Sequence, residues 1–239
     1  MNTTKASPHG TNRKTATIVG VLFIIGTAAG ILSVPVMSIL GAPDYLNMAA
    51  SNPIRVALGA LLMLVMGLAL AMVPAMMFPI LKRRNEPLAI GYVIFRGALE
   101  TFTTLALAMC WLLLVVVARQ SADSGAAVAS QFGSVGFLLL KAPDTIMAIG
   151  GIVFCLGALM FYYLLYQARL IPRWISGWGI VAAVASLAAD LSAMFGTNMD
   201  ILKMLMLVQE MVMAVWLIAK GFNPVAIASL SAKTAANEL

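Results

Sequence analysis

TIVGVLFIIGTAAGILSVPVMSIL, residues 17–40, contains no charged residue, and it sets the interpretation of the whole chain. A helix of this length rises about 36 Å at 1.5 Å per residue, which is enough to cross the ~30 Å hydrocarbon core of a bilayer. A secretory signal peptide starts in a similar way, but its apolar core is only about 7–15 residues long. We therefore interpret residues 17–40 as an uncleaved first transmembrane span.

The composition of the whole chain is that of a protein whose main solvent is lipid. Of its 239 residues, 62% are hydrophobic and 10% are charged, and the mean hydropathy is +0.98. Soluble domains are about half apolar and a quarter charged. The formal charge of +6 does not indicate a nucleic-acid partner, because the basic residues lie at the ends of apolar segments, as they do in membrane loops. We expect a lipid bilayer as the partner and no nucleic acid.

Further apolar segments predict an all-α integral membrane protein, a bundle of six transmembrane helices. The later spans are predicted at about 54–81, 88–118, 144–168, 172–195 and 200–220. Pro53 and Pro87 favour helix starts, and Gly221 favours a helix end. Residues 127–142 contain an apolar run too short to span, so we expect a short interfacial or re-entrant helix before the fourth span. The predicted domains are a disordered cytoplasmic tail at 1–12, the transmembrane domain at 13–222 and a cytoplasmic tail at 223–239.

The distribution of Lys and Arg predicts the orientation. One side of the membrane would carry Lys5, Arg13, Lys14, Lys82, Arg83, Arg84, Arg169, Arg173, Lys220 and Lys233, and the other only Arg55, Arg119, Lys141 and Lys203. Cytoplasmic loops are the ones enriched in basic residues, so both termini are predicted in the cytoplasm. Tyr162, Tyr163 and Tyr166 are typical of an aromatic belt at the interface.

Metal and disulfide chemistry have little basis in the sequence. His9, in the polar tail, is the only histidine, and the chain has no CxxC motif or metal-ligand spacing. Cys110 and Cys155 are predicted at different depths, whereas bonded cysteines need Cα atoms within about 7 Å. We predict no disulfide, no metal site and no cofactor.

Four charged residues are predicted within the spans: Arg96, Glu100 and Glu210 lie deep, and Asp190 lies within about 8 Å of the outer end of its span. A charge near the bilayer centre costs about 2.5–3.5 kcal/mol on insertion scales. Glu100 lies about 18 Å and Glu210 about 15 Å from the start of its span at helical rise, so both are near the midplane. Tyr92, Arg96, Glu100 and Thr104 recur every four residues, so they form one polar stripe that must face protein. Arg96 can then bind Glu100 and reach Glu210, which leaves one net negative charge or one shared proton.

This predicted cluster has two interpretations. It is either a buried polar lock that fixes helix register, or the lining of a water-filled cavity that binds or relays a proton or a small polar solute. A second, shallower cluster of Arg55, Asp190 and Lys203 is predicted at the outer face, and we interpret it as a solvated rim.

Four blocks of the sequence resemble a known bacterial family. They are NPIRVALGALLMLVM (52–66), FPILKRRNEPLAIGYVIFRGALE (78–100), YYLLYQARLIPRWISGWG (162–179) and WLIAKGFNP (216–224). In order and content they resemble the multi-pass membrane family DUF4386, a domain of unknown function, from about Arg13 to Pro224. The resemblance implies an all-helical bundle in the bacterial inner membrane and implies no activity. The positions that match the family's pattern are Asn52, Pro53, Arg55, Arg96, Glu100, Pro172, Glu210, Lys220 and Gly221, whereas Asp190 departs from it.

Two function classes follow from these features. The first is a small transporter or a solute- or proton-binding bundle that uses Arg96, Glu100, Glu210, Tyr92 and Thr104. The alternative is a non-catalytic partner or sensor subunit, in which the buried charges are a structural lock. An enzyme is less well supported, because the sequence has no Ser–His pairing, HExxH motif or Asp-rich lipid-phosphotransfer signature, and we predict no catalytic residue.

Overall fold

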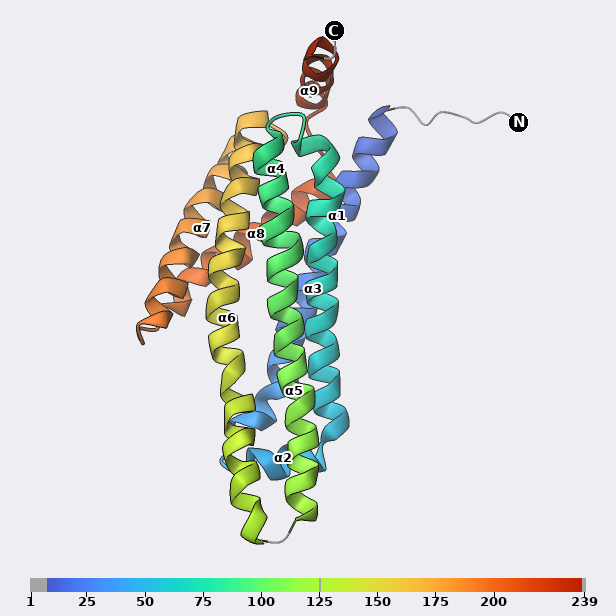
Figure 1. Ribbon diagram of the computed structural model, residues 1–239. Helices are drawn as coiled ribbons and strands as arrows, with labels where there is room; N and C mark the ends of the chain where they lie inside the picture. Colours follow the sequence, from blue (N-terminus) through green and yellow to red (C-terminus); the bar gives the residue numbers. More distant parts are fainter. Residues whose placement is uncertain (1–7, 125, 238–239) are drawn as a thin grey trace, which may run out of the picture.

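The computed structural model describes residues 8–124 and 126–237, and all regular structure within them is helical (Figure 1). The elements in chain order are α1 (Pro8–Met37), η1 (Ser38–Gly41), α2 (Tyr45–Ser51), α3 (Pro53–Leu81), α4 (Glu86–Tyr92), the π-helix η2 (Val93–Leu99), α5 (Glu100–Asp123), α6 (Ala126–Ala168), α7 (Arg173–Met194), η3 (Asp200–Lys203), α8 (Met204–Ala219) and α9 (Pro224–Asn237). Six helical stretches of the described chain are long and apolar enough to cross a membrane. The predicted all-α membrane bundle is thereby confirmed.

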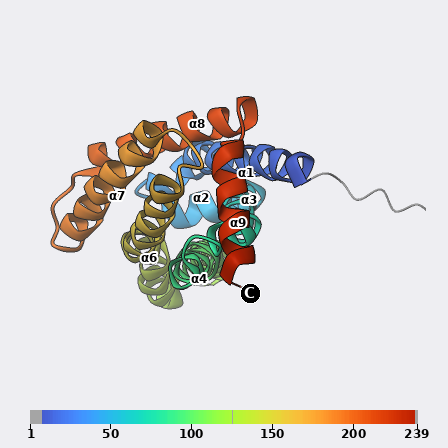
Figure 2. The same ribbon diagram turned by 90° about the horizontal axis from the view of Figure 1, so that it is seen from above.

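The six spans form a closed ring. Contacts between the elements run α1–α3, α3–α5, α5–α6, α6–α7 and α7–α8, and α8 returns to α1. Each span therefore lies beside its neighbours in the sequence, as the view from above shows (Figure 2). Short connections between antiparallel helices give this arrangement without crossing loops.

The chain starts and ends its helices where local chemistry favours it. Pro53 occupies the first turn of α3, where its missing N–H group would have no helical partner. Asn85 caps α4, because its side-chain oxygen accepts from the Leu88 N–H at 3.0 Å. Gly221 ends α8 with φ of 75°, in the left-handed region that glycine adopts without steric cost. The predicted boundary signals at Pro53, Pro87 and Gly221 therefore lie at helix ends.

The prediction of a separate short helix at 127–142 was wrong, because these residues are the first part of one continuous helix, α6. Its 43 residues rise about 64 Å at 1.5 Å per residue, roughly twice the hydrocarbon thickness. A proline such as Pro143 removes one hydrogen bond and can bend a helix without ending it. The apolar run does not lie against lipid alone: Leu139 and Leu140 pack against a small core that includes Leu114.

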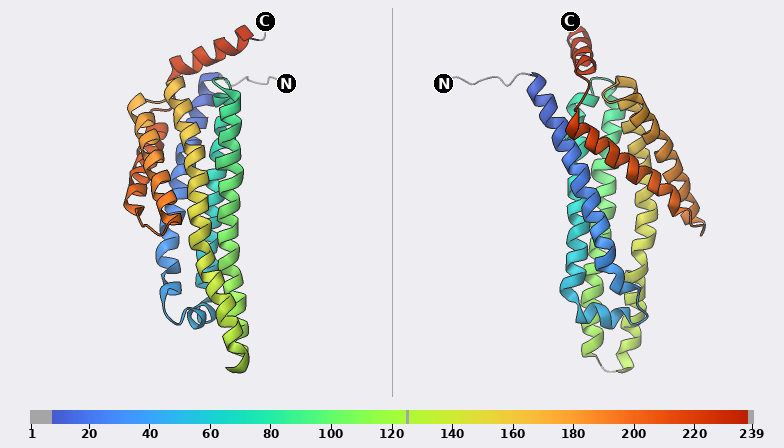
Figure 3. Two further views of the ribbon diagram at one scale, coloured as in Figure 1. Left: turned by 60° about the vertical axis from the view of Figure 1, so that its left-hand side comes forward. Right: turned by 180° about the vertical axis from the view of Figure 1, so that it is seen from behind.

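The lower ends of α5 and α6 extend beyond the turn between α7 and α8, and the short helix α2 lies across the bundle there (Figure 1). This hairpin end has its own apolar core, formed by residues of η1, α2, α3 and α5 such as Leu40, Ala49, Val56 and Leu114. The opposite end carries the start of α1 and all of α9, and we call it the termini end (Figure 3).

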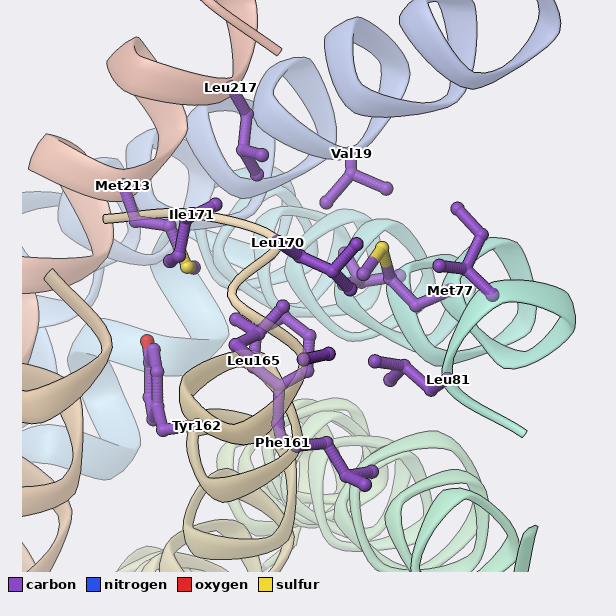
Figure 4. Packing of buried hydrophobic residues seen from close by; sticks show 14 of the residues in the cluster. Val19, Met77, Leu81, Phe161, Tyr162, Leu165, Leu170, Ile171, Met213 and Leu217 are labelled. Carbon is purple, nitrogen blue, oxygen red and sulfur yellow. The ribbon is translucent and has the colours of Figure 1, made fainter. Parts of the chain in front are cut away.

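The larger core lies toward the termini end and joins all six spans. Val19, Met77, Leu165, Met213 and Leu217, from α1, α3, α6 and α8, are buried and point toward one another (Figure 4). The outer surface of the ring is also apolar, with exposed side chains such as those of Leu61, Leu112, Val181 and Val215. An apolar core inside an apolar surface is expected when lipid surrounds the bundle.

The two predicted tails differ from the structure in extent. α1 already begins at Pro8, inside the predicted tail of residues 1–12, whereas residues 1–7 lie outside the described residues. The C-terminal segment forms α9, and Ala226, Ile227 and Leu230 on one side of it are buried.

Candidate functional site

Arg96 binds two glutamates that come from different spans. Its Nη1 donates to Oε1 and Oε2 of Glu100, both at 2.8 Å, and its Nη2 donates to Oε1 of Glu210 at 3.1 Å. Glu100 begins α5, whereas Glu210 lies on α8, which is not a neighbour of α5 in the ring. The Arg96 side chain therefore reaches across the interior of the ring, and only 3% of it is exposed.

A local π-helix places Arg96. Residues Val93–Leu99 form η2, in which the Glu100 N–H bonds to the carbonyl of Phe95, five residues earlier. Such π-turns inside α-helices are rare and occur often at functional sites. α6 approaches η2 closely at Gly157, where a Cβ atom would lie 3.2 Å from the Arg96 backbone nitrogen. The close contact excludes lipid from the charged side of η2.

An aromatic ring completes the environment of the guanidinium. Cζ of Arg96 lies 4.3 Å from the centroid of the Phe154 ring on α6. A cation over a ring face is attracted by the ring quadrupole, more strongly where water is excluded. The guanidinium thus has two carboxylates and one ring as partners.

Tyr92 and Thr104, the outer members of the predicted stripe, do not contact the carboxylates by hydrogen bonds. Tyr92 is buried and stacks on Phe161 at 4.6 Å between ring centroids, and its hydroxyl has no protein hydrogen-bond partner. The Thr104 hydroxyl donates to the backbone carbonyl of Glu100 at 2.8 Å. Thr104 therefore supports the helix beside the site, whereas Tyr92 presents an unpaired hydroxyl near it.

A cavity of about 190 Å³ lies beside Glu100. It is lined by α3, α5 and α6, with Met63, Thr103 and Phe154 among the lining residues. Since a water molecule occupies about 30 Å³ in the liquid, this space can hold a few waters or a small solute. Glu100, whose side chain is 17% exposed, is the member of the charged cluster that borders it.

A second hydrogen-bonded group lies on the termini side of the cluster, and the sequence did not predict it. Gln209, next to Glu210, accepts from the Tyr162 hydroxyl at 2.6 Å and donates to the Ile175 carbonyl at 3.0 Å. Tyr162 is 1% exposed, so its assignment to the interface belt was wrong, whereas Tyr163 and Tyr166 are exposed. The group ties α6, α7 and α8 together directly beside the site.

The predicted outer cluster forms only in part. Lys203 Nζ lies 2.7 Å from Oδ1 of Asp190 and 2.9 Å from Oδ1 of Asp200. Asp190 is buried against α6, where it meets Gly151 and lies 3.8 Å from Sγ of Cys155. Asp190 is therefore a buried partner of Lys203, whereas the prediction was a solvated rim.

Arg55 is not part of that cluster, which corrects the prediction. Its guanidinium donates to the carbonyls of Pro35 and Val36, both at 2.9 Å, and so satisfies the end of α1. Cations near a helix C-terminus stabilise it. Its helix, α3, contacts α1 and α5 in the ring and so lies apart from Asp190 on α7.

Acidic, histidine and cysteine side chains do not gather into a metal-binding group of three or more within the described ranges. Cys110 and Cys155 are both free thiols. Arg96, Glu100 and Glu210 remain the candidate site, because they combine buried charge, a local π-helix and an adjacent cavity.

Comparison with known proteins identifies a family but no function. The model of a family described as a domain of unknown function (DUF4386) matches residues 18–221. No curated protein and no solved structure matches the chain.

Proposed function

The chain belongs to the DUF4386 family of unknown function, and we propose that it is a small transporter whose central site binds a proton or a small cationic solute. It is a polytopic membrane protein. The excess of Lys and Arg at the termini end supports an orientation with both termini in the cytoplasm, and the family resemblance supports a bacterial inner membrane as its location.

One observation carries the proposal: a single arginine serves two buried carboxylates, and one of these borders a cavity. With all three groups ionised, Arg96, Glu100 and Glu210 carry one net negative charge inside the membrane. An unbalanced charge there is costly, so binding a proton or a cation would stabilise the cluster. The cavity beside Glu100 supplies a place from which such a ligand could reach the carboxylate.

Two further features support exchange rather than permanent closure. The π-helix at Val93–Leu99 changes the backbone hydrogen-bond pattern of the third span at the level of the site, and π-turns occur often at functional sites. The hydroxyls of Tyr92 and Ser186 are buried without a protein partner, and buried hydroxyls are normally paired with protein or water. The Tyr92 hydroxyl, one helical turn from Arg96, could therefore donate to a bound water or solute near the cluster.

The alternative, a structural lock in a partner or sensor subunit, has support of its own. The guanidinium of Arg96 already has two carboxylates and the Phe154 ring as partners within the protein. A purely structural role does not need the cavity. It predicts that the charged cluster exchanges no protons with bulk water.

Charge displacement after a pH step distinguishes the two functions. Proteoliposomes on a solid-supported membrane would receive rapid pH steps, and transient currents would be compared for wild type, Glu100→Gln and Glu210→Gln. Glu86→Gln is the matched control, because Glu86 is an acidic residue of the first turn of α4, away from the cluster. We expect currents from wild type and Glu86→Gln, and their loss in the other two variants at unchanged folding. The proposal fails if wild type gives no current, or if neither central variant changes it.

A further inference from the structure

A cavity at the termini end is separate from the central site. It has a volume of about 580 Å³ and lies between the α6–α7 turn and the α8–α9 turn. A backbone hydrogen bond of 2.9 Å from the Asn223 N–H to the Leu170 carbonyl joins the two turns. Cavities of about 300–1,000 Å³ are the usual size of small-molecule sites.

Three basic residues line this cavity. They are Arg169 and Arg173 from the first turn and Lys220 from the end of α8. The guanidinium of Arg173 lies 5.0 Å from the centroid of the Tyr166 ring, which holds it in place. Among the acidic residues in the described ranges, Glu86 alone lies at this end of the bundle. The local charge is therefore strongly positive. Such a field attracts anions.

The backbone at the cavity also favours an anion. α7 begins at Arg173 and α9 at Pro224, and both residues line the cavity. The N-terminal ends of both helices therefore meet there, and helix N-termini carry partial positive charge and unpaired N–H groups. The Asn223 side chain already caps α9 by accepting from the Val225 N–H at 3.0 Å.

The backbone conformation of Arg169 is the most specific sign of a binding role. Arg169 follows the last residue of α6 and has φ of 53°, in the left-handed region where helices usually place glycine or asparagine. At the equivalent end of α8 this chain does use glycine, Gly221. An arginine in this conformation is unfavourable locally, which points to a role for its guanidinium in the cavity.

The remaining walls are apolar. Leu170, Ile171, Trp216 and Phe222 line the cavity, and Trp216 is an aromatic residue in the last turn of a membrane span. The cavity thus combines cations with an apolar wall at the edge of the membrane.

We propose that this cavity binds a phosphate-bearing anion, namely the headgroup of an anionic phospholipid. Arginine pairs suit phosphate because the guanidinium donates two parallel hydrogen bonds, and Lys220 adds a point charge. Basic pockets on the cytoplasmic side of membrane bundles are typical places for anionic headgroups. A soluble phosphate compound shares this chemistry, so the test must separate the two sources. The proposal goes beyond the central site and does not depend on it.

The experiment compares two variants of equal charge. The first is Arg169→Asn, Arg173→Gln and Lys220→Gln, where asparagine suits the left-handed backbone. The control is Lys14→Gln, Lys82→Gln and Lys233→Gln, which removes three charges from the same end outside the cavity. Each protein would be placed in vesicles of phosphatidylglycerol and phosphatidylcholine. After the protein is released from the vesicles, native mass spectrometry would measure how much phosphatidylglycerol stays bound to it. We expect retention to fall at least about tenfold in the first variant and by less than about twofold in the control.

A second arm identifies the source of the phosphate. Protein in pure phosphatidylcholine nanodiscs would be titrated with inorganic phosphate in a calorimeter. Saturable heat that the first variant lacks would assign a soluble phosphate ligand, whereas lipid retention without such heat assigns the headgroup. If both variants lose phosphatidylglycerol equally, the lipid is held by general surface attraction and the proposal is overturned. The proposal is also overturned if neither variant loses lipid and the titration with phosphate gives no saturable heat. If the first variant does not fold, the single substitution Arg173→Glu replaces it as the test, and Lys82→Glu becomes the control.

Discussion

Replacing Arg96 by methionine tests whether it is the residue that holds the charged cluster together. Methionine keeps most of the apolar stem but leaves Glu100 and Glu210 without the donors that now lie 2.8 and 3.1 Å away. Removing one partner of a buried ion pair costs about 3–5 kcal/mol, because the other charge stays buried and unpaired. Arg96 serves two carboxylates, so we expect a loss of about 5 kcal/mol in the free energy of unfolding.

Two comparison variants give this number its meaning. Glu210→Gln keeps a hydrogen-bond acceptor for Arg96 and removes the surplus negative charge, so we expect a loss of at most about 1.5 kcal/mol. The triple variant Arg96→Met, Glu100→Gln and Glu210→Gln has no unpaired charge. Neutral replacement of a whole buried ionic group is often tolerated, so the triple variant should be more stable than Arg96→Met alone by about 2 kcal/mol or more.

The assay is equilibrium unfolding of purified protein in mixed micelles titrated with SDS, followed by tryptophan fluorescence. The reasoning is refuted if Arg96→Met costs no more than Glu210→Gln, because Arg96 would then not be the common partner. It is also refuted if the triple variant is no more stable than Arg96→Met, because unpaired carboxylates would then not be the source of the loss.

Three other predictions concern the α6–α7–α8 side of the ring. Lys203→Ala leaves the buried Asp190 of α7 unpaired and should lower the free energy of unfolding by about 1–3 kcal/mol. Asp200→Asn, at an exposed position, should change it by less than about 0.5 kcal/mol. Gly151→Ala should lower the melting temperature, because its Cβ would meet that aspartate, whereas Gly133→Ala, where a Cβ meets nothing within 4 Å, should not. Tyr162→Phe leaves a buried amide oxygen unpaired and should cost about 1–3 kcal/mol in the same SDS titration; no loss would mean that the oxygen finds another donor.

The sequence predicted the membrane architecture well, because the bilayer imposes strong rules. A span needs about 20 apolar residues with its backbone hydrogen bonds satisfied internally, so hydropathy alone locates the helices. The error at 127–142 has a clear cause. The length rule assumes that an apolar run outside a full span needs lipid, but Leu139 and Leu140 are covered by the hairpin-end core. Contacts between segments distant in the sequence are absent from a hydropathy profile.

The central site was also predictable in part. Four-residue spacing placed Arg96 with Glu100, and equal depth placed Glu210 at the same level. Depth does not fix direction around a helix, however, and that is why the outer cluster was only partly right. Arg55 has a suitable depth, but it points to the end of α1, whereas Lys203 meets Asp190.

Partners without charge could not be found from the sequence. Phe154 looks like any other apolar residue of its span, and nothing in its neighbourhood indicates that it lies against a guanidinium. The π-helix at Val93–Leu99 has no sequence signal comparable to a cap or a proline. Gln209 had a weak signal, since it is a second polar residue beside Glu210 near the midplane, and a buried amide there requires partners.

The glycines of α6 explain how charged residues are tolerated on both sides of that helix. Gly157 lets the Arg96 backbone approach, and Gly151 does the same for the carboxylate of Asp190. In lipid, helices associate through close packing of small residues rather than through the hydrophobic effect. Small residues on α6 thus allow η2 and α7 to press their charged positions against protein instead of lipid. Because the two glycines lie six residues apart, and so on different faces, one helix can shield two separate ionic groups.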